Sequence, residues 1–108
     1  MTTVTIYKSP EGNYTGLSVS GHAEYADSGK DIVCAAVSLL TINTINAIGR
    51  FTKDGITVEE EDENNGLIVC RLKECSKETA LLMQTFEMGV RELAKQYVRE
   101  LCVKEERG

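Results

Sequence analysis

Alternation of apolar and polar side chains marks two strands at the start of the chain. Residues 2–8 are rich in β-branched types, which favour extended backbone. Residues 14–21 then alternate, with Leu17 and Val19 on one face and serines on the other. The segment between the two runs, residues 9–13, contains Pro, Gly and Asn, which are typical of a tight turn. We therefore predict a hairpin of two strands with one apolar face.

A long apolar segment follows, and its spacing predicts a helix from Asp31 to about Ile48. Asp31 is a good N-cap residue, and Gly49 is of the type that often ends a helix. Further apolar residues spread beyond a single helical face, so we expect more than one element to cover this helix. Residues 23–30, which precede the helix, have no usable period and are predicted to form a loop. One face of the predicted helix is made up of Val33, Val37, Leu40, Thr44 and Ala47.

Two more strands and a second helix are predicted in the second half of the chain. The strands span residues 56–61 and 67–73, and an Asn-Gly pair between them is typical of a hairpin turn. Ser76 is a suitable N-cap for a helix over residues 77–96. Residues 98–105 fit either the tail of that helix or a final strand, and we favour the strand.

These elements together predict an α+β fold. The order β-β-α-β-β-α-β places two helices on a mostly antiparallel sheet. Residues 1–108 have the length of one domain, and neither a linker nor a low-complexity segment divides them. We therefore expect a single domain.

The charge balance restricts the kinds of partner. With 12 basic and 17 acidic side chains, the formal net charge is −5. Direct binding of nucleic acid needs clustered Lys and Arg, so it is not expected, whereas a basic protein partner is compatible. The acidic run at residues 59–63 is interpreted as a solvated hairpin end, and steering of a basic substrate is the alternative.

Sequence features of secretion and of membrane insertion are not apparent. The N-terminus lacks a basic flank followed by an apolar core, and no run approaches about 18 consecutive apolar residues. We therefore expect a cytoplasmic protein without a membrane partner.

The four cysteines are expected to be thiols, because no oxidising compartment is indicated. Three of them, Cys70, Cys75 and Cys102, are expected to be small buried residues. A zinc site is not expected, because no Cys-x-x-Cys pair exists and His22 is the single histidine. Neither a metal nor another cofactor is predicted.

Cys34 and His22 are the candidate chemical pair. With a helix start at Asp31, Cys34 lies in the first turn, where free amides and the helix dipole favour an anion such as a thiolate. His22 follows the end of a predicted strand and can serve as a base. Such a pair is suited to acyl transfer, with the amides near Cys34 available to the oxyanion. The residues alone leave open that Cys34 is a small core residue and His22 an ordinary polar one.

The residues around this pair resemble the signature of a known family. The sequence contains Gly21-His22-Ala23, then Gly29, then Asp31-Ile32-Val33-Cys34-Ala35-Ala36-Val37-Ser38. These blocks are similar to the GHA and G-x-D-I-V-C-A-A-V-S motifs of the Prp family of ribosomal-processing cysteine proteases. The resemblance implies that Cys34 and His22 are the catalytic residues, as a Cys–His dyad.

The same resemblance implies a cytoplasmic bacterial endopeptidase. Its substrate would be the N-terminal extension of a large-subunit ribosomal protein near the peptidyl-transferase centre, cut after a short stretch that ends in aromatic residues. Asp31 either orients His22 or caps the helix, and Ser38 either orients local groups or bonds a backbone carbonyl. The supporting or substrate-binding positions that the resemblance implies are Gly21, Ala23, Gly29, Asp31 and Ser38.

Two expectations concern assembly and motion. We expect a homodimer with an interface that includes the segment 39–48, because the first helix is apolar on more sides than one sheet can cover, and the resemblance agrees. We also expect residues 23–30 to form a lid over the site, with Gly21 and Gly29 as its hinges and Tyr25 as its one large side chain.

Two other functions compete with the protease. The first is a non-catalytic ribosome-associated adaptor that binds a peptide, which would need neither Cys34 nor His22. The second is a redox sensor, which would need Cys34 alone.

Overall fold

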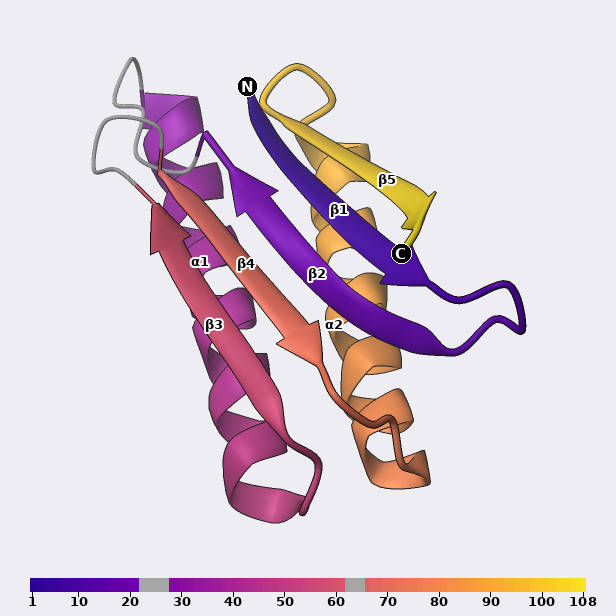
Figure 1. Ribbon diagram of the computed structural model, residues 1–108. Coiled ribbons are helices and arrows are strands. Elements are labelled where there is room, and N and C mark those ends of the chain that lie inside the picture. Colours follow the sequence, from indigo (N-terminus) through magenta and orange to yellow (C-terminus); the bar gives the residue numbers. More distant parts are fainter. Residues whose placement is uncertain (22–27, 62–65) are drawn as a thin grey trace.

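The described residues fold into a five-stranded sheet with two helices on one of its faces (Figure 1). The structure, a computed structural model, describes residues 1–21, 28–61 and 66–108. The α+β class and the predicted order of elements are confirmed. In chain order the elements are β1 (Thr2–Lys8), β2 (Tyr14–Ser20), α1 (Ser28–Phe51), β3 (Ile56–Glu61), β4 (Leu67–Leu72), α2 (Lys77–Gln96) and β5 (Leu101–Arg107).

The strands lie in the order β3-β4-β2-β1-β5. Three neighbouring pairs are antiparallel, and β1 with β5 is parallel, so the sheet is mostly antiparallel as predicted. β5 begins at Leu101, later than the predicted strand, because residues 97–100 form a turn. In that turn the amides of Glu100 and Leu101 both donate to the carbonyl oxygen of Tyr97. Leu101 then pairs with Thr2, the first residue of β1.

The core lies between the sheet and the two helices. Burial of an aliphatic or aromatic side chain of this kind contributes about 1.5–3 kcal/mol, so this layer is the main source of stability. Its largest fully buried apolar members come from β1, β2 and both helices and are Val4, Ile6, Leu17, Val19, Val33, Val37, Ile48, Met83, Phe86 and Val90.

α1 is longer than the sequence pattern predicts and is apolar on its outward face. It continues beyond Gly49 to Phe51. Ile32 is 53%, Leu39 70% and Ile42 52% exposed, whereas the opposite side of the helix is in the core. By length and composition alone the segment 32–51 could cross a membrane, but the core helix of a soluble protein passes the same test. The same composition suits a core helix whose outward face is covered by another protein surface.

A capped start fixes α2 against the end of α1. Ser76 is the N-cap, and its Oγ accepts a hydrogen bond from the amide of Thr79. The carboxylate of Asp54, in the connection after α1, accepts from both the amide and the hydroxyl of Ser76 at 2.8 and 2.7 Å. Hydrogen bonds from Thr79 and Ser76 lower the pKa of Asp54. The predicted start of α2 is thereby confirmed.

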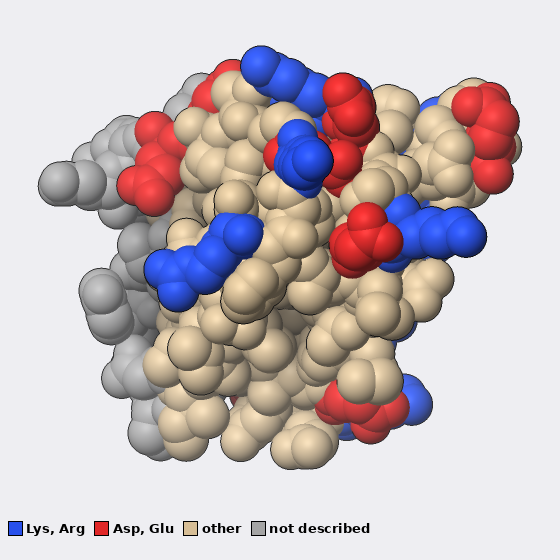
Figure 2. Space-filling view, turned by 90° about the horizontal axis from the view of Figure 1, so that it is seen from below, with Lys and Arg blue, Asp and Glu red and all other residues tan. Residues whose placement is uncertain are grey.

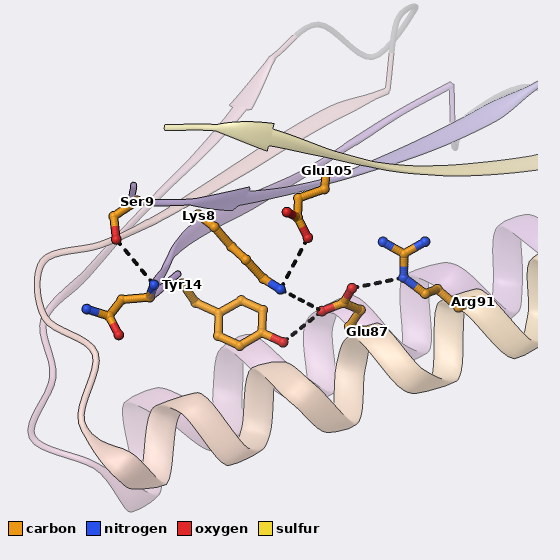
Figure 3. Close-up of polar contacts among 7 residues, drawn as sticks. Lys8, Ser9, Tyr14, Glu87, Arg91 and Glu105 are labelled. Atoms are coloured by element: carbon orange, nitrogen blue, oxygen red, sulfur yellow. Dashed lines mark hydrogen bonds and ion pairs between the residues drawn. The ribbon is translucent and has the colours of Figure 1, made fainter. Parts of the chain in front are cut away.

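A charged cluster joins α2 to three strands at the end of the sheet away from Thr2 (Figure 3). Tyr14 donates its hydroxyl hydrogen to Glu87 at 2.7 Å, and Arg91 donates to the same carboxylate at 2.9 Å. Lys8 lies 3.7 Å from Glu87 and 3.2 Å from Glu105, with its ammonium over the Tyr14 ring. The half-buried Glu87 is therefore surrounded by donors from β1, β2 and α2.

The face seen from below carries acidic and basic side chains in mixture (Figure 2). Neither sign forms a continuous patch on that face.

Candidate active site

The first residue of β1, the end of β2 and the start of α1 meet at one end of the sheet (Figure 1). Cys34 is the seventh residue of α1 and is only 7% exposed. Its Sγ lies 3.7 Å from Oγ1 of Thr2, which is 4% exposed. The predicted nucleophile therefore lies at the junction between α1 and the sheet, with its sulfur directed to the first strand.

The position of Cys34 within α1 corrects one step of the sequence argument. Because α1 begins at Ser28, Asp31 is the fourth helical residue and not the N-cap. The amides without a partner belong to the first four residues, and the dipole's effect falls off within the first turn. Cys34 lies beyond that turn, so its own amide is not an open donor. Ser is a residue type typical of helix starts, so Ser28 fits its position. The sequence pattern did not indicate this start because Gly29 has a low helix propensity.

Gly21 has a geometric reason to be glycine. Its φ is +80°, in the region that side chains rarely adopt. A Cβ at this position would lie 2.6 Å from the carbonyl oxygen of Met1, closer than real contacts allow. Gly21 thus lets the chain leave β2 close against the first residues of β1, immediately before His22.

The structure describes some of the other predicted site residues. His22 and Ala23 lie outside the described residues, as does the part of the predicted lid at residues 23–27. The remainder, residues 28–30, belongs to α1, so Gly29 is a helical residue and not a hinge between the lid and the helix. The lid as drawn from the sequence is therefore wrong at its C-terminal end.

Ser38 lies one helical turn beyond Cys34 and is half-buried. The two residues share a side of α1, because positions four apart on a helix lie one above the other. Asp31 lies nearer the start of α1, within its first turn. Among the described residues, no group of three or more His, Cys, Asp or Glu side chains could hold a metal ion.

The other three thiols occupy different environments. Cys70 is buried in β4, and burial raises its pKa to about 11. Cys75 is half-buried, and burial also raises its pKa. Cys102 is exposed, so the expectation that it is a small buried residue is wrong. All four cysteines are thiols, and those of Cys70 and Cys75 stay protonated near neutral pH.

Thr2 is the residue at this site that the sequence analysis missed. The period of two along β1 was available as a signal, since it places Thr2 on the same face as Val4 and Ile6. No spacing relates Thr2 to Cys34, however, because the two are 32 positions apart and meet only through the fold.

Comparison with known proteins gives consistent results. The model of the family described as cysteine protease Prp matches residues 1–101. A similar protein is the ribosomal processing cysteine protease Prp of Staphylococcus aureus, 28% identical over 97 residues that cover 90% of this chain and 92% of the relative.

Two solved structures have the same fold. One is an essential ribosomal processing protease Prp from S. aureus in complex with a substrate peptide. It is 26% identical with a TM-score of 0.90, over 98% of this chain and 100% of the other. The same protease with a covalently linked product peptide is 28% identical with a TM-score of 0.86, over 98% and 100%.

Proposed function

Since this chain belongs to the cysteine protease Prp family, we propose that it removes the N-terminal extension of a large-subunit ribosomal protein during ribosome maturation. The observation that carries the proposal is the family match over almost the whole chain, with Cys34 at the junction of α1 and β1. The acidic net charge of −5 also suits a basic ribosomal substrate. We place this reaction in the cytoplasm, where reduced thiols are stable.

Cys34 is the nucleophile of the proposed reaction and His22 its base. His22 accepts the proton of the Cys34 thiol, and the sulfur adds to the carbonyl carbon of the scissile peptide bond. The C–N bond then breaks, and the protonated His22 gives its proton to the leaving amine. Water, deprotonated by His22, hydrolyses the resulting thioester and regenerates the thiol. Every proton that leaves the sulfur or the water is thus returned through a single imidazole.

The test uses a synthetic peptide that contains the extension, with its short aromatic ending, and follows cleavage by mass spectrometry. Cys34→Ala and His22→Ala should each abolish cleavage while the melting temperature stays close to that of the wild type. Cys102→Ala is the matched control, because it removes an exposed thiol by the same substitution. Cys70→Ser and Cys75→Ser should also retain cleavage. Cleavage at near wild-type rate by Cys34→Ala or His22→Ala would refute the dyad.

The proposed enzyme acts as a homodimer. The exposed apolar side chains of α1 support this, because Ile32, Leu39 and Ile42 are each more than half exposed on one uncharged side of the helix. Ile48, at the end of the interface segment expected from the sequence, is fully buried in the core. The proposed interface therefore uses the outward residues of that segment and not its whole length.

A further inference from the structure

The hydroxyl of Thr2 is close to the sulfur of Cys34. Their Oγ1 and Sγ atoms are 3.7 Å apart, which is within reach of a hydrogen bond to sulfur. Both side chains are more than nine-tenths buried, so water competes little for either atom. A contact in such surroundings influences the orientation and the charge of the sulfur more than one in solvent.

The backbone of Thr2 is held from two sides. Its amide donates to the carbonyl oxygen of Glu100 at 2.9 Å, and Thr2 pairs with Leu101 in the parallel register of β1 and β5. On the other side Gly21 lies next to Thr2, and a Cβ there would be in van der Waals contact with the Thr2 Cα at 3.5 Å. The β-branched side chain is also stiff about χ1. The hydroxyl is therefore presented to Cys34 from a fixed position.

We propose that Thr2 is a positioning residue for the nucleophile, donating its hydroxyl hydrogen to the Cys34 sulfur whenever that sulfur carries no proton. In the thiol form either atom can be the donor. A thiolate has no hydrogen, so Thr2 is then the donor, and the bond stabilises the ion and fixes the sulfur's direction. The inference rests on the proposed function, because a positioned sulfur matters for catalysis where Cys34 attacks the substrate.

A purely structural role for Thr2 makes different predictions. If the hydroxyl only fills a buried polar position, its removal lowers stability and leaves the pH dependence of Cys34 reactivity unchanged. If it positions the sulfur, its removal shifts that dependence even in a fully folded variant. The pH profile of alkylation therefore separates the two roles.

Four proteins are compared: the wild type, Thr2→Val, Thr2→Ser and Thr2→Ala. Valine keeps the shape of threonine without the hydroxyl. The Ser and Ala variants form a second pair that differs in the hydroxyl alone, and this pair decides the question if Thr2→Val does not fold. Iodoacetamide labelling of Cys34 is measured against pH by peptide mass spectrometry, and the exposed Cys102 is the internal control in every sample.

We expect the pH midpoint for Cys34 labelling to rise by about one unit in Thr2→Val and Thr2→Ala, with about tenfold slower labelling at neutral pH. Thr2→Ser should stay within about threefold of the wild type, since a hydrogen bond to a charged group is kept. Cys102 labelling should not change. In peptide cleavage, kcat should fall about tenfold in Thr2→Val with KM unchanged.

Equal pH midpoints of Cys34 labelling in folded wild type, Thr2→Val and Thr2→Ala would overturn the inference. This holds even if Cys34→Ala abolishes cleavage, so that the proposed function stands. If Cys34→Ala instead cleaves normally, the proposed function fails. The labelling profiles still decide on Thr2 in that case, because alkylation of Cys34 does not depend on peptide cleavage.

Discussion

At the scale of single residues, the site depends on a backbone conformation that glycine alone adopts without strain. Gly21 combines a φ of +80° with a close approach to the Met1 carbonyl oxygen. We predict that Gly21→Ala costs about 1–2 kcal/mol for the positive φ and a further amount for displacing Met1. Because Thr2 follows Met1, cleavage and Cys34 labelling should fall more than the loss of stability explains.

Gly12 provides a matched control for this prediction. Its φ is +89°, but a Cβ there would meet nothing within 4 Å. Gly12→Ala should therefore show the cost of the positive φ alone, with normal activity. The measurements are chemical unfolding and peptide cleavage on both variants. Equal stabilities and equal activities for the two would show that the contact with Met1 is of no consequence.

The sequence predicts residue roles where a motif carries them and misses those that the fold creates. Cys34 and His22 follow from two short blocks at a recognisable spacing, and Cys34 lies where the sheet, α1 and β1 meet. The hydrogen bond to Thr2 depends on the register of β1 against β5 and on the depth of α1, and neither is written in a local pattern. Cys102 was misjudged for the same reason, since only the sheet shows which face of β5 is covered.

At the scale of elements, boundaries were predicted well where local chemistry decides them. The strand Thr2–Lys8, the strand Ile56–Glu61 and the helix Lys77–Gln96 agree with the expected ranges, because turn residues or a Ser76 cap limit each of them. α1 was predicted too short at both ends. Gly29 and Gly49 resemble helix breakers locally, but each lies inside a helix that the sheet stabilises.

The attachment of α2 to the strands should depend on pH through Glu87. Burial raises the pKa of this carboxyl, but hydrogen bonds from Tyr14 and Arg91 and the positive charges of Lys8 and Arg91 outweigh burial, and the pKa is lowered overall. Because the pKa of Glu87 is lower in the folded state, its ionised carboxylate stabilises the protein at pH values above the pKa that Glu87 has in the unfolded chain. That stabilisation is lost as the pH falls through the pKa that Glu87 has in the folded protein.

We therefore predict that Glu87→Gln lowers the free energy of unfolding most above about pH 5, and that the difference from wild type narrows towards pH 3. Urea unfolding of both proteins at several pH values measures the difference in their free energies of unfolding. Glu92→Gln is the control on the same helix, because its ion pair with Lys95 is exposed and should contribute less than about 0.5 kcal/mol at any pH. A difference for Glu87→Gln that stays constant from pH 7 to pH 3 would contradict the prediction.

At the scale of the whole molecule, the β-β-α-β-β-α-β order was enough to predict the α+β class but not which outer surface stays uncovered. Two helices cover one face of the sheet, and an apolar helix such as α1 then has a side left over. The hydrophobic pattern correctly indicated that α1 has more apolar surface than the sheet covers. It could not show that Ile48 faces the core while Leu39 and Ile42 face outwards, because that depends on how α1 is rotated about its own axis.

The uncovered apolar side of α1 leads to the prediction of a homodimer. The outward side of α1 carries no charged residue between Ile32 and Gly49, and exposed apolar side chains gathered on an uncharged side of a helix mark an interface. Because a two-fold axis brings the same patch of both copies together, one substitution acts on both sides of the interface. A charge at Leu39, which is 70% exposed, would be buried twice in the dimer and solvated in the monomer.

Light scattering at micromolar concentration should therefore give twice the 11.9 kDa of one chain for the wild type and a single-chain mass for Leu39→Glu. Leu81→Glu is the matched control, since Leu81 is 64% exposed on α2 and should tolerate the charge without loss of the dimer. Circular dichroism checks that both variants are folded. A monomeric wild type, or a Leu39→Glu variant that still dimerises, would remove α1 as the interface, whereas dissociation by Leu81→Glu alone would place the interface on α2.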